Sequence, residues 1–134
     1  MPLQDDSEHR NSPATRQGPS DPEVKLRLVV GSGVLIGPGR IALLEAIREC
    51  GAIAAAARRT GISYRKTRTL IDELNIAFDR PVVHSSRGGA EHGGAHLTPL
   101  GERLIARYRA LEHDTAARAT EQFSRHSLGL DDDD

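Results

Sequence analysis

The sequence predicts a mainly α-helical fold with small β hairpins. Two glycines, Gly51 and Gly61, divide an apolar-periodic stretch into three short helices. A glycine-rich hairpin at 82–97 follows, and a last amphipathic helix begins at the Thr98-Pro99 pair. Helix, short helix, turn, helix, hairpin, helix is the order of a winged helix-turn-helix with a C-terminal dimerisation helix.

The N-terminal part is expected to be a tail followed by a first hairpin. Residues 1–23 are polar and proline-containing, and they predict a disordered segment. From Val24, "VKLRLVV" alternates apolar and charged residues, which predicts a half-buried strand, and "GSG" and "VLI" predict a turn and a second strand. A nucleotide-binding glycine loop is the competing interpretation. The hairpin is favoured because Gly31, Gly33 and Gly37 have a different spacing and lead into strand.

The first two predicted helices form the support of the domain. "GPGRIALLEAIRECG" places apolar residues on one face and stops at Gly51. That face consists of Leu43, Leu44, Ile47 and Cys50, and the single cysteine is predicted to be a buried small residue. "AIAAAARRTG" predicts a short second helix, whose alanines allow another helix to approach closely.

The third predicted helix runs from Tyr64 to about Phe78 behind the N-cap Ser63. Helical periodicity places Thr67, Leu70, Ile71, Leu74 and Phe78 on its inner face. The cations stand at its N-terminal end, and the acids Asp72 and Glu73 lie further along. This order is the reverse of what the helix dipole favours, so we predict a recognition helix rather than a solvated structural face. The predicted DNA contacts are Ser63, Tyr64, Arg65, Lys66, Arg68 and Thr69.

The hairpin and the last helix complete the predicted domain at 24–112. Val82–Val83 and Ala95–Leu97 are its short strands, and Arg87 is a predicted phosphate contact of the wing. The last helix fades towards Phe123, and 113–134 is predicted to be its continuation and an acidic disordered tail. The predicted dimer interface is the stripe Leu100, Leu104, Tyr108 and Leu111.

Other classes of function are disfavoured. His84, His92 and His96 lie close in sequence, but no cysteine or carboxylate at zinc-like spacing accompanies them, so no metal and no cofactor is predicted. No nucleophile–base pair or carboxylate dyad is recognisable, and an enzyme is not expected. A net charge of −1 excludes a uniformly basic coat but permits a local basic patch between acidic ends. No signal peptide or membrane-spanning run is visible, so a cytoplasmic protein that binds no membrane is expected.

Several motifs carry a family resemblance: "GISY" at the turn, "DELN" at the third helix, "LIGPGR" before the first, and "LTPLGERL" after the glycine wing. Over about 24–112 the chain resembles the N-terminal DNA-binding domain of ModE-type, molybdate-responsive regulators, which is similar to the LysR-type winged helix. The resemblance implies a homodimeric transcription factor that binds double-stranded DNA at a palindromic promoter site. In such regulators a separate C-terminal domain binds molybdate. We expect a single-domain relative that binds no molybdate, because 134 residues leave no room for that domain.

Three positions depart from the family pattern. Glu91 stands in the wing where a lysine among glycines is common, and it would be unfavourable near phosphate. Ala54 stands where Ser or Thr usually caps the second helix, and Arg68 replaces a large apolar or aromatic residue. The near-neutral charge and the acidic wing also keep open a second interpretation, a winged-helix module for protein interaction or dimerisation without specific DNA binding.

Overall fold

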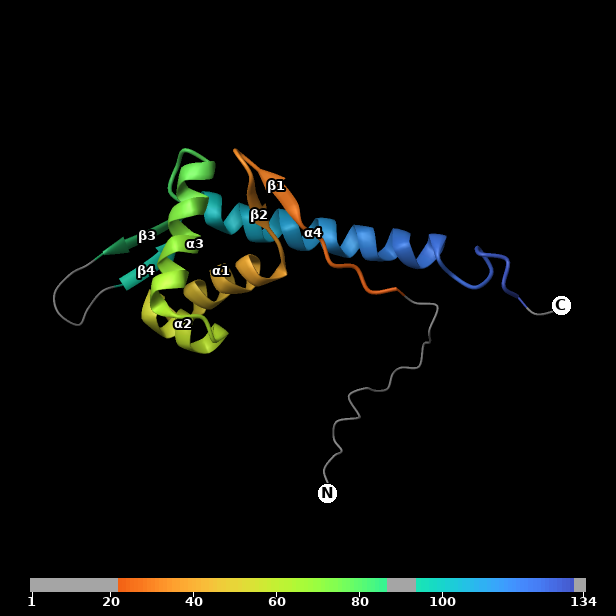
Figure 1. The fold of residues 1–134 in the computed structure, drawn as a ribbon, viewed down its shortest axis with the longest axis horizontal. Coiled ribbons are helices and arrows are strands. Elements are labelled where there is room, and N and C mark those ends of the chain that lie inside the picture. The colour runs from red at the N-terminus through yellow and green to blue at the C-terminus, as the bar shows by residue number, and fades with distance from the viewer. Residues whose placement is uncertain (1–21, 87–93, 132–134) are drawn as a thin grey trace, which may run out of the picture. The chain divides into compact units, whose positions relative to one another are not determined.

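The predicted mainly helical fold with two small antiparallel strand pairs is confirmed. The computed structural model describes residues 22–86 and 94–131; residues 1–21, 87–93 and 132–134 lie outside this description. Figure 1 shows the elements, and their order is compatible with a winged helix-turn-helix. They are β1 (Leu28–Val30), β2 (Val34–Ile36), α1 (Pro38–Cys50), α2 (Ile53–Thr60), α3 (Tyr64–Ala77), β3 (Val83–Ser86), β4 (Gly94–Leu97) and α4 (Pro99–Gln122).

The first hairpin is shorter than its alternating sequence predicts. β1 begins at Leu28, not at Val24, and Leu28 pairs with Ile36, the last residue of β2. The residues before Leu28 therefore have no strand opposite them. The backbone carbonyl of Leu26 instead accepts a hydrogen bond of 2.9 Å from the hydroxyl of Tyr108 in α4.

Both predicted glycine stops are confirmed. Gly51 and Gly61 end α1 and α2 in the left-handed conformation, with φ of 73° and 76°, which glycine adopts without a steric penalty. The amide of Gly51 donates to the carbonyl of Ile47 at 2.9 Å. The prediction that Cys50 is buried was wrong: as the last residue of α1 it is only half-buried.

The start of α2 corrects a detail of the sequence analysis. The N-cap is Ala52, not Ala54, and its extended backbone has a φ of −157°. Its carbonyl accepts from the amide of Ala56 at 3.0 Å, but a methyl side chain cannot accept a hydrogen bond from the helix amides. An uncapped start of this kind costs about 1 kcal/mol relative to a Ser or Thr cap.

The core lies between α1, α2, α3 and the base of the β3–β4 hairpin. α1 packs on α2 and on β4, and α3 packs on α2. Ala56 and Ala57 of α2 are buried, and their small side chains allow close packing. The largest side chains with less than 2% exposure are those of Ile41, Leu43, Leu44, Ile47, Thr67, Leu74 and Val82.

The second hairpin is fixed at its base by Thr98. Val83 pairs with Leu97 in antiparallel register, and the amide of Thr98 donates to the carbonyl of Val82 at 3.0 Å. The Thr98 hydroxyl donates to the carbonyl of Pro81 at 2.8 Å and accepts from the amide of Gly101 at 3.1 Å. Thr98 therefore caps α4, as predicted, and also ties that helix to the start of β3.

The structure divides into two units, and the boundary falls within α4. One unit is Lys25–Ala110, which holds the core and the elements described above; the other includes 111–131. In this second unit α4 continues to Gln122, and turns follow it. No helix of the described residues is long and apolar enough to cross a membrane.

Candidate nucleic-acid interface

The start of α3 is built as the sequence predicts. Ser63 is the N-cap in an extended backbone conformation, and its Oγ accepts a hydrogen bond of 3.0 Å from the amide of Lys66. The carbonyl of Ser63 also accepts from the amide of Thr67 at 2.9 Å. This cap fixes the first turn of α3 and leaves other first-turn amides facing solvent.

The inner face of α3 is confirmed. Thr67, Ile71 and Leu74 are buried, and Leu70 and Phe78 are half-buried against the core. This packing sets the rotation of the helix, so the opposite face points to solvent.

The solvent face begins with two cations that form no ion pair within the described residues. Arg65 and Lys66 are exposed, as are Ser63 and Thr69, and Tyr64 is 54% exposed. The hydroxyl of Thr69 donates its hydrogen bond to the backbone carbonyl of Arg65, one turn earlier in the helix, at 3.1 Å. Five of the six predicted contacts at this helix are therefore exposed.

Four other cations of the body are paired with carboxylates. Arg48 donates to Glu102 at 3.0 Å, and Arg59 pairs with Glu49. Two more pairs join α1 to α3 and to α4: Arg40–Glu73 at 3.1 Å and Arg109–Glu45 at 2.9 Å. Arg65 and Lys66 at the start of α3, by contrast, have no carboxylate partner in the described residues.

The two acids of α3 lie further along the helix than Arg65 and Lys66, and both have a basic neighbour. Glu73 pairs with Arg40, whose guanidinium also donates to the carbonyl of Leu70 at 3.4 Å. Asp72 lies 3.9 Å from the guanidinium of Arg68. These basic neighbours weaken the repulsion that the carboxylates would exert on a nearby phosphate.

Arg68, the sixth predicted contact, lies differently from the others. Its side chain is 38% exposed, and its Nη1 donates to the Oγ of Ser85 in β3 at 3.1 Å. Sequence analysis singled out neither Ser85 nor Asn75, whose Oδ1 accepts from the amide of Val82 at 2.7 Å. Asn75 is the last residue of the motif "DELN", and it lies seven positions after Arg68, on the same side of the helix.

The wing presents two of its three histidines. His84 and His96 are directly opposite in the β3–β4 register, and their exposed rings lie 5.6 Å apart between centroids. Arg87, Glu91 and His92 lie outside the described residues. Within the described ranges, no group of three or more His, Cys, Asp or Glu side chains is placed to hold a metal ion.

The predicted dimer stripe is divided between the core and the surface. Tyr108 is 2% exposed and hydrogen-bonded to Leu26, and Leu100 and Leu104 are half-buried against the core. Leu111 is 42% exposed. The first three side chains therefore serve the fold of a single chain, and Leu111 is the one free for a contact with another.

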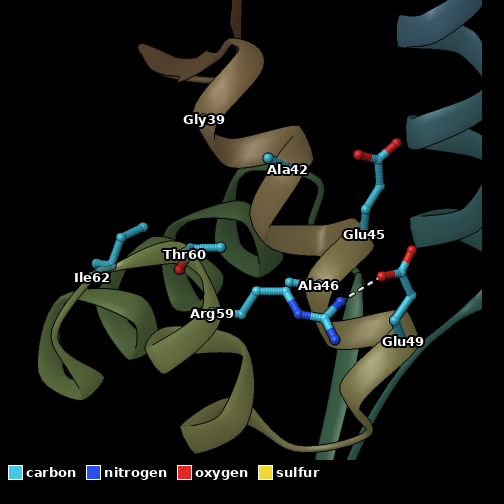
Figure 2. Close-up of a pocket in the computed structure, with 8 residues that line it drawn as sticks. All are labelled: Gly39, Ala42, Glu45, Ala46, Glu49, Arg59, Thr60 and Ile62. Atoms are coloured by element: carbon cyan, nitrogen blue, oxygen red, sulfur yellow. Dashed lines mark hydrogen bonds and ion pairs between the residues drawn. The ribbon is translucent and has the colours of Figure 1, made fainter. Parts of the chain in front are cut away.

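A shallow, open cavity of about 420 Å³ lies beside α1. Figure 2 shows that Arg59 reaches across it to Glu49, while the carboxylate of Glu45 stands on the same side. Arg109 and Arg48 lower the pKa of Glu45, the hydrogen bonds from Arg109 acting most strongly, so this carboxylate stays ionised. The lining also includes the small or apolar side chains of Ala42, Ala46 and Ile62.

The elements around α3 define a helix-turn-helix module. They are a short helix, a tight glycine turn and a capped helix with a basic, exposed start, beside a two-stranded hairpin.

Sequence comparison identifies relatives of this chain. The Molybdenum-pterin-binding protein MopB of Rhodobacter capsulatus is 42% identical over 120 residues, which is 88% of this chain and 44% of MopB. The Transcriptional regulator ModE of Yersinia pestis is 37% identical over 109 residues, 81% of this chain and 41% of ModE. The DNA-binding transcriptional dual regulator ModE of Escherichia coli (strain K12) is 37% identical over 89 residues, 66% of this chain and 34% of that protein.

These similarities confirm that the chain is related to ModE and Mop proteins, and it spans less than half the length of each. No family model matches the chain. Among solved structures, ArgP from Mycobacterium tuberculosis gives a TM-score of 0.43 at 24% identity, covering 60% of this chain and 29% of ArgP.

Proposed function

We propose that the chain is a DNA-binding transcriptional regulator that places the N-terminal half of α3 in the major groove. One observation carries the proposal: Arg65 and Lys66 stand side by side, exposed and without ion pairs in the described residues, at the start of a capped helix. Four other arginines of the body, Arg40, Arg48, Arg59 and Arg109, are paired with carboxylates. Unpaired cations can neutralise phosphates without first losing a carboxylate partner. Two of the relatives are named as transcriptional regulators, which agrees with this assignment.

The proposed direct contacts are the exposed residues of this surface. Arginine can pair bidentately with guanine, and serine, threonine and tyrosine hydroxyls can reach phosphates or base edges. The first-turn amides of α3 add a partial positive charge that favours phosphate. The residues are Ser63, Tyr64, Arg65, Lys66 and Thr69, and Arg87 remains a proposed contact that lies outside the described residues.

The proposal includes a homodimer on a palindromic promoter site, since helix-turn-helix proteins commonly read two half-sites about 34 Å apart. α4 is the proposed dimerisation helix, and Leu111 is the exposed residue of its predicted stripe. The measurement is the molar mass by sedimentation equilibrium, alone and on a duplex. The wild type is expected to be a dimer, and the variant Leu111→Glu is expected to be a monomer. A wild type that is monomeric on DNA would contradict the proposed homodimer.

Molybdate binding is not expected of this chain, although relatives carry molybdenum in their names. The cavity beside α1 is lined by the carboxylates of Glu45 and Glu49, which repel an oxyanion, and its one arginine, Arg59, is paired. Adding sodium molybdate is therefore expected to leave the DNA affinity of this chain unchanged.

Fluorescence anisotropy with labelled duplexes tiled across the region upstream of its own gene tests the proposal. Binding is expected at a subset of duplexes, with an affinity that falls steeply as KCl is raised, because counterions are released from the phosphates. Absence of binding to every duplex at low salt would overturn the DNA-binding function.

A second candidate function rests on a different surface. Val29 and Leu35 are opposite each other in the β1–β2 hairpin and are 67% and 49% exposed. Exposed apolar pairs of this kind favour a protein-interaction module. The anisotropy titrations with duplexes distinguish the two candidate functions, since a protein-interaction module would show no salt-sensitive binding to any duplex.

A further inference from the structure

The recognition helix holds the first strand of the wing at two points. At one end, Asn75 Oδ1 accepts from the amide of Val82 at 2.7 Å and from that of Val83 at 3.4 Å. At the other, Arg68 Nη1 donates to Ser85 Oγ at 3.1 Å.

The two contact points match in spacing. Arg68 and Asn75 are separated by seven residues of α3, a rise of about 10 Å. Val82 and Ser85 are separated by three residues of extended chain, also about 10 Å. The strand therefore runs beside the helix in the opposite direction, and each contact fixes one end of the segment that they share.

Ser85 is on the side of β3 that faces the body. Alternation along a strand puts Ser85 on the face of Val83, which is buried, and puts His84 on the other face. Beyond Val83 the residues of β3 are exposed, so apolar packing no longer holds this part of the strand. The hydrogen bond from Arg68 supplies a contact where packing ends.

We propose that Arg68 is a positioning residue, which sets the angle between the recognition helix and the wing through Ser85 instead of contacting DNA itself. Its guanidinium is engaged by Ser85 and lies 3.9 Å from Asp72, whereas the neighbouring Arg65 has no ion pair in the described part of the chain. The inference rests on the proposed DNA-binding function for its consequence. The link between helix and wing can be measured without DNA.

The DNA-free test is hydrogen exchange at the amides of β3 and β4 in the wild type and in three variants. Arg68→Ala and Ser85→Ala are each expected to speed exchange in the hairpin. Ser85→Thr is expected to retain wild-type protection, because it keeps the hydroxyl, and Arg65→Ala serves as the matched control on the same helix. Unchanged hairpin exchange in both alanine variants would overturn the inference, whether or not the chain binds DNA.

The DNA test uses whichever upstream duplex the wild type binds. Arg68→Ala, Ser85→Ala and the double variant are each expected to raise Kd by a similar factor, about threefold to tenfold, because all three remove one hydrogen bond. The slope of log Kd against log salt should stay that of the wild type, whereas Arg65→Ala should reduce it by about one. A reduced slope in Arg68→Ala together with a wild-type Kd in Ser85→Ala would show a direct phosphate contact and overturn the positioning role. If the wild type binds no duplex but the hairpin exchange changes, the proposed function fails and the link between helix and wing stands.

Discussion

Arg109 and Glu45 form a bidentate ion pair that joins α4 to α1 across 64 residues of sequence. Arg109 Nε donates to one carboxylate oxygen at 3.1 Å and Nη2 to the other at 2.9 Å. The parallel geometry gives stronger and more directional bonds than a single contact. The guanidinium also lies 5.8 Å from the ring centroid of Tyr108, the residue that anchors α4 to Leu26. This pair therefore fastens the part of α4 around Arg109 to α1.

The pair predicts a specific acid sensitivity. Because Arg109 lowers the pKa of Glu45 below its ordinary 4.5, the folded state binds a proton less readily than the unfolded state. The stabilisation is complete above pH 4.5 and is lost as the pH falls through the lowered value. Near neutral pH, Glu45→Gln is expected to reduce the free energy of unfolding by about 0.5–1 kcal/mol, since both side chains are partly exposed.

Urea denaturation of wild type and Glu45→Gln across the acid range is the measurement. The difference between them should shrink as the pH is lowered below 4.5. Glu23→Gln, which removes an exposed carboxylate without an ion pair in the described residues, is the control for the change in net charge. A difference that stays constant with pH would contradict the role of the ion pair.

Two buried threonines are expected to respond oppositely to the same substitution. Thr67 is fully buried, and its hydroxyl has no hydrogen-bond partner in the described structure, so Thr67→Val should leave the stability unchanged or raise it by up to about 1 kcal/mol. Thr98 bonds to Pro81 and Gly101, and Thr98→Val should lower the stability by about 1–3 kcal/mol. Thermal and urea unfolding measure both. A large loss in Thr67→Val would mean that its hydroxyl has a partner.

Local features of the sequence predicted much of α3. The Ser63 cap and the Gly61 stop depend on neighbours within four residues, and the inner face follows from helical periodicity. The contact of Arg68 with Ser85 spans 17 residues, and no periodicity encodes it. Charge alone therefore suggested a DNA contact for Arg68, and the structure gives it a neighbour in the wing.

The dimer stripe shows a second limit. Leu104, Tyr108 and Leu111 recur at helical spacing, which predicts an apolar face but not what covers it. The core of the same chain covers Tyr108, because α1 and the segment before β1 supply partners far away in sequence. Periodicity cannot distinguish this from a contact with a second chain, and only Leu111 remains exposed.

Close packing at the start of α4 gives another prediction. A Cβ added to Gly101 would lie 2.5 Å from the carbonyl oxygen of Val82, which is backbone and cannot rotate away. Gly101→Ala is expected to lower the free energy of unfolding by about 1–3 kcal/mol by forcing α4 from the hairpin. Gly39→Ala is the matched control, because its added methyl meets nothing within 4 Å and helix propensity favours alanine by up to about 1 kcal/mol. Equal melting temperatures for the two variants would contradict the packing argument.

The charge at the start of α3 gives the prediction most directly tied to function. Arg65→Ala combined with Lys66→Ala is expected to weaken binding to an upstream duplex and to reduce the salt slope by about two, because each cation that contacts a phosphate releases about one counterion. Stability should change little, since both side chains are exposed and unpaired in the described structure. Arg103→Ala combined with Arg107→Ala, which removes two exposed cations of α4, is the control for net charge. Anisotropy titrations across a range of KCl distinguish the two pairs. An equal reduction of the salt slope in both double variants would contradict a DNA contact specific to α3, because the net charge of the chain alone would then explain the effect.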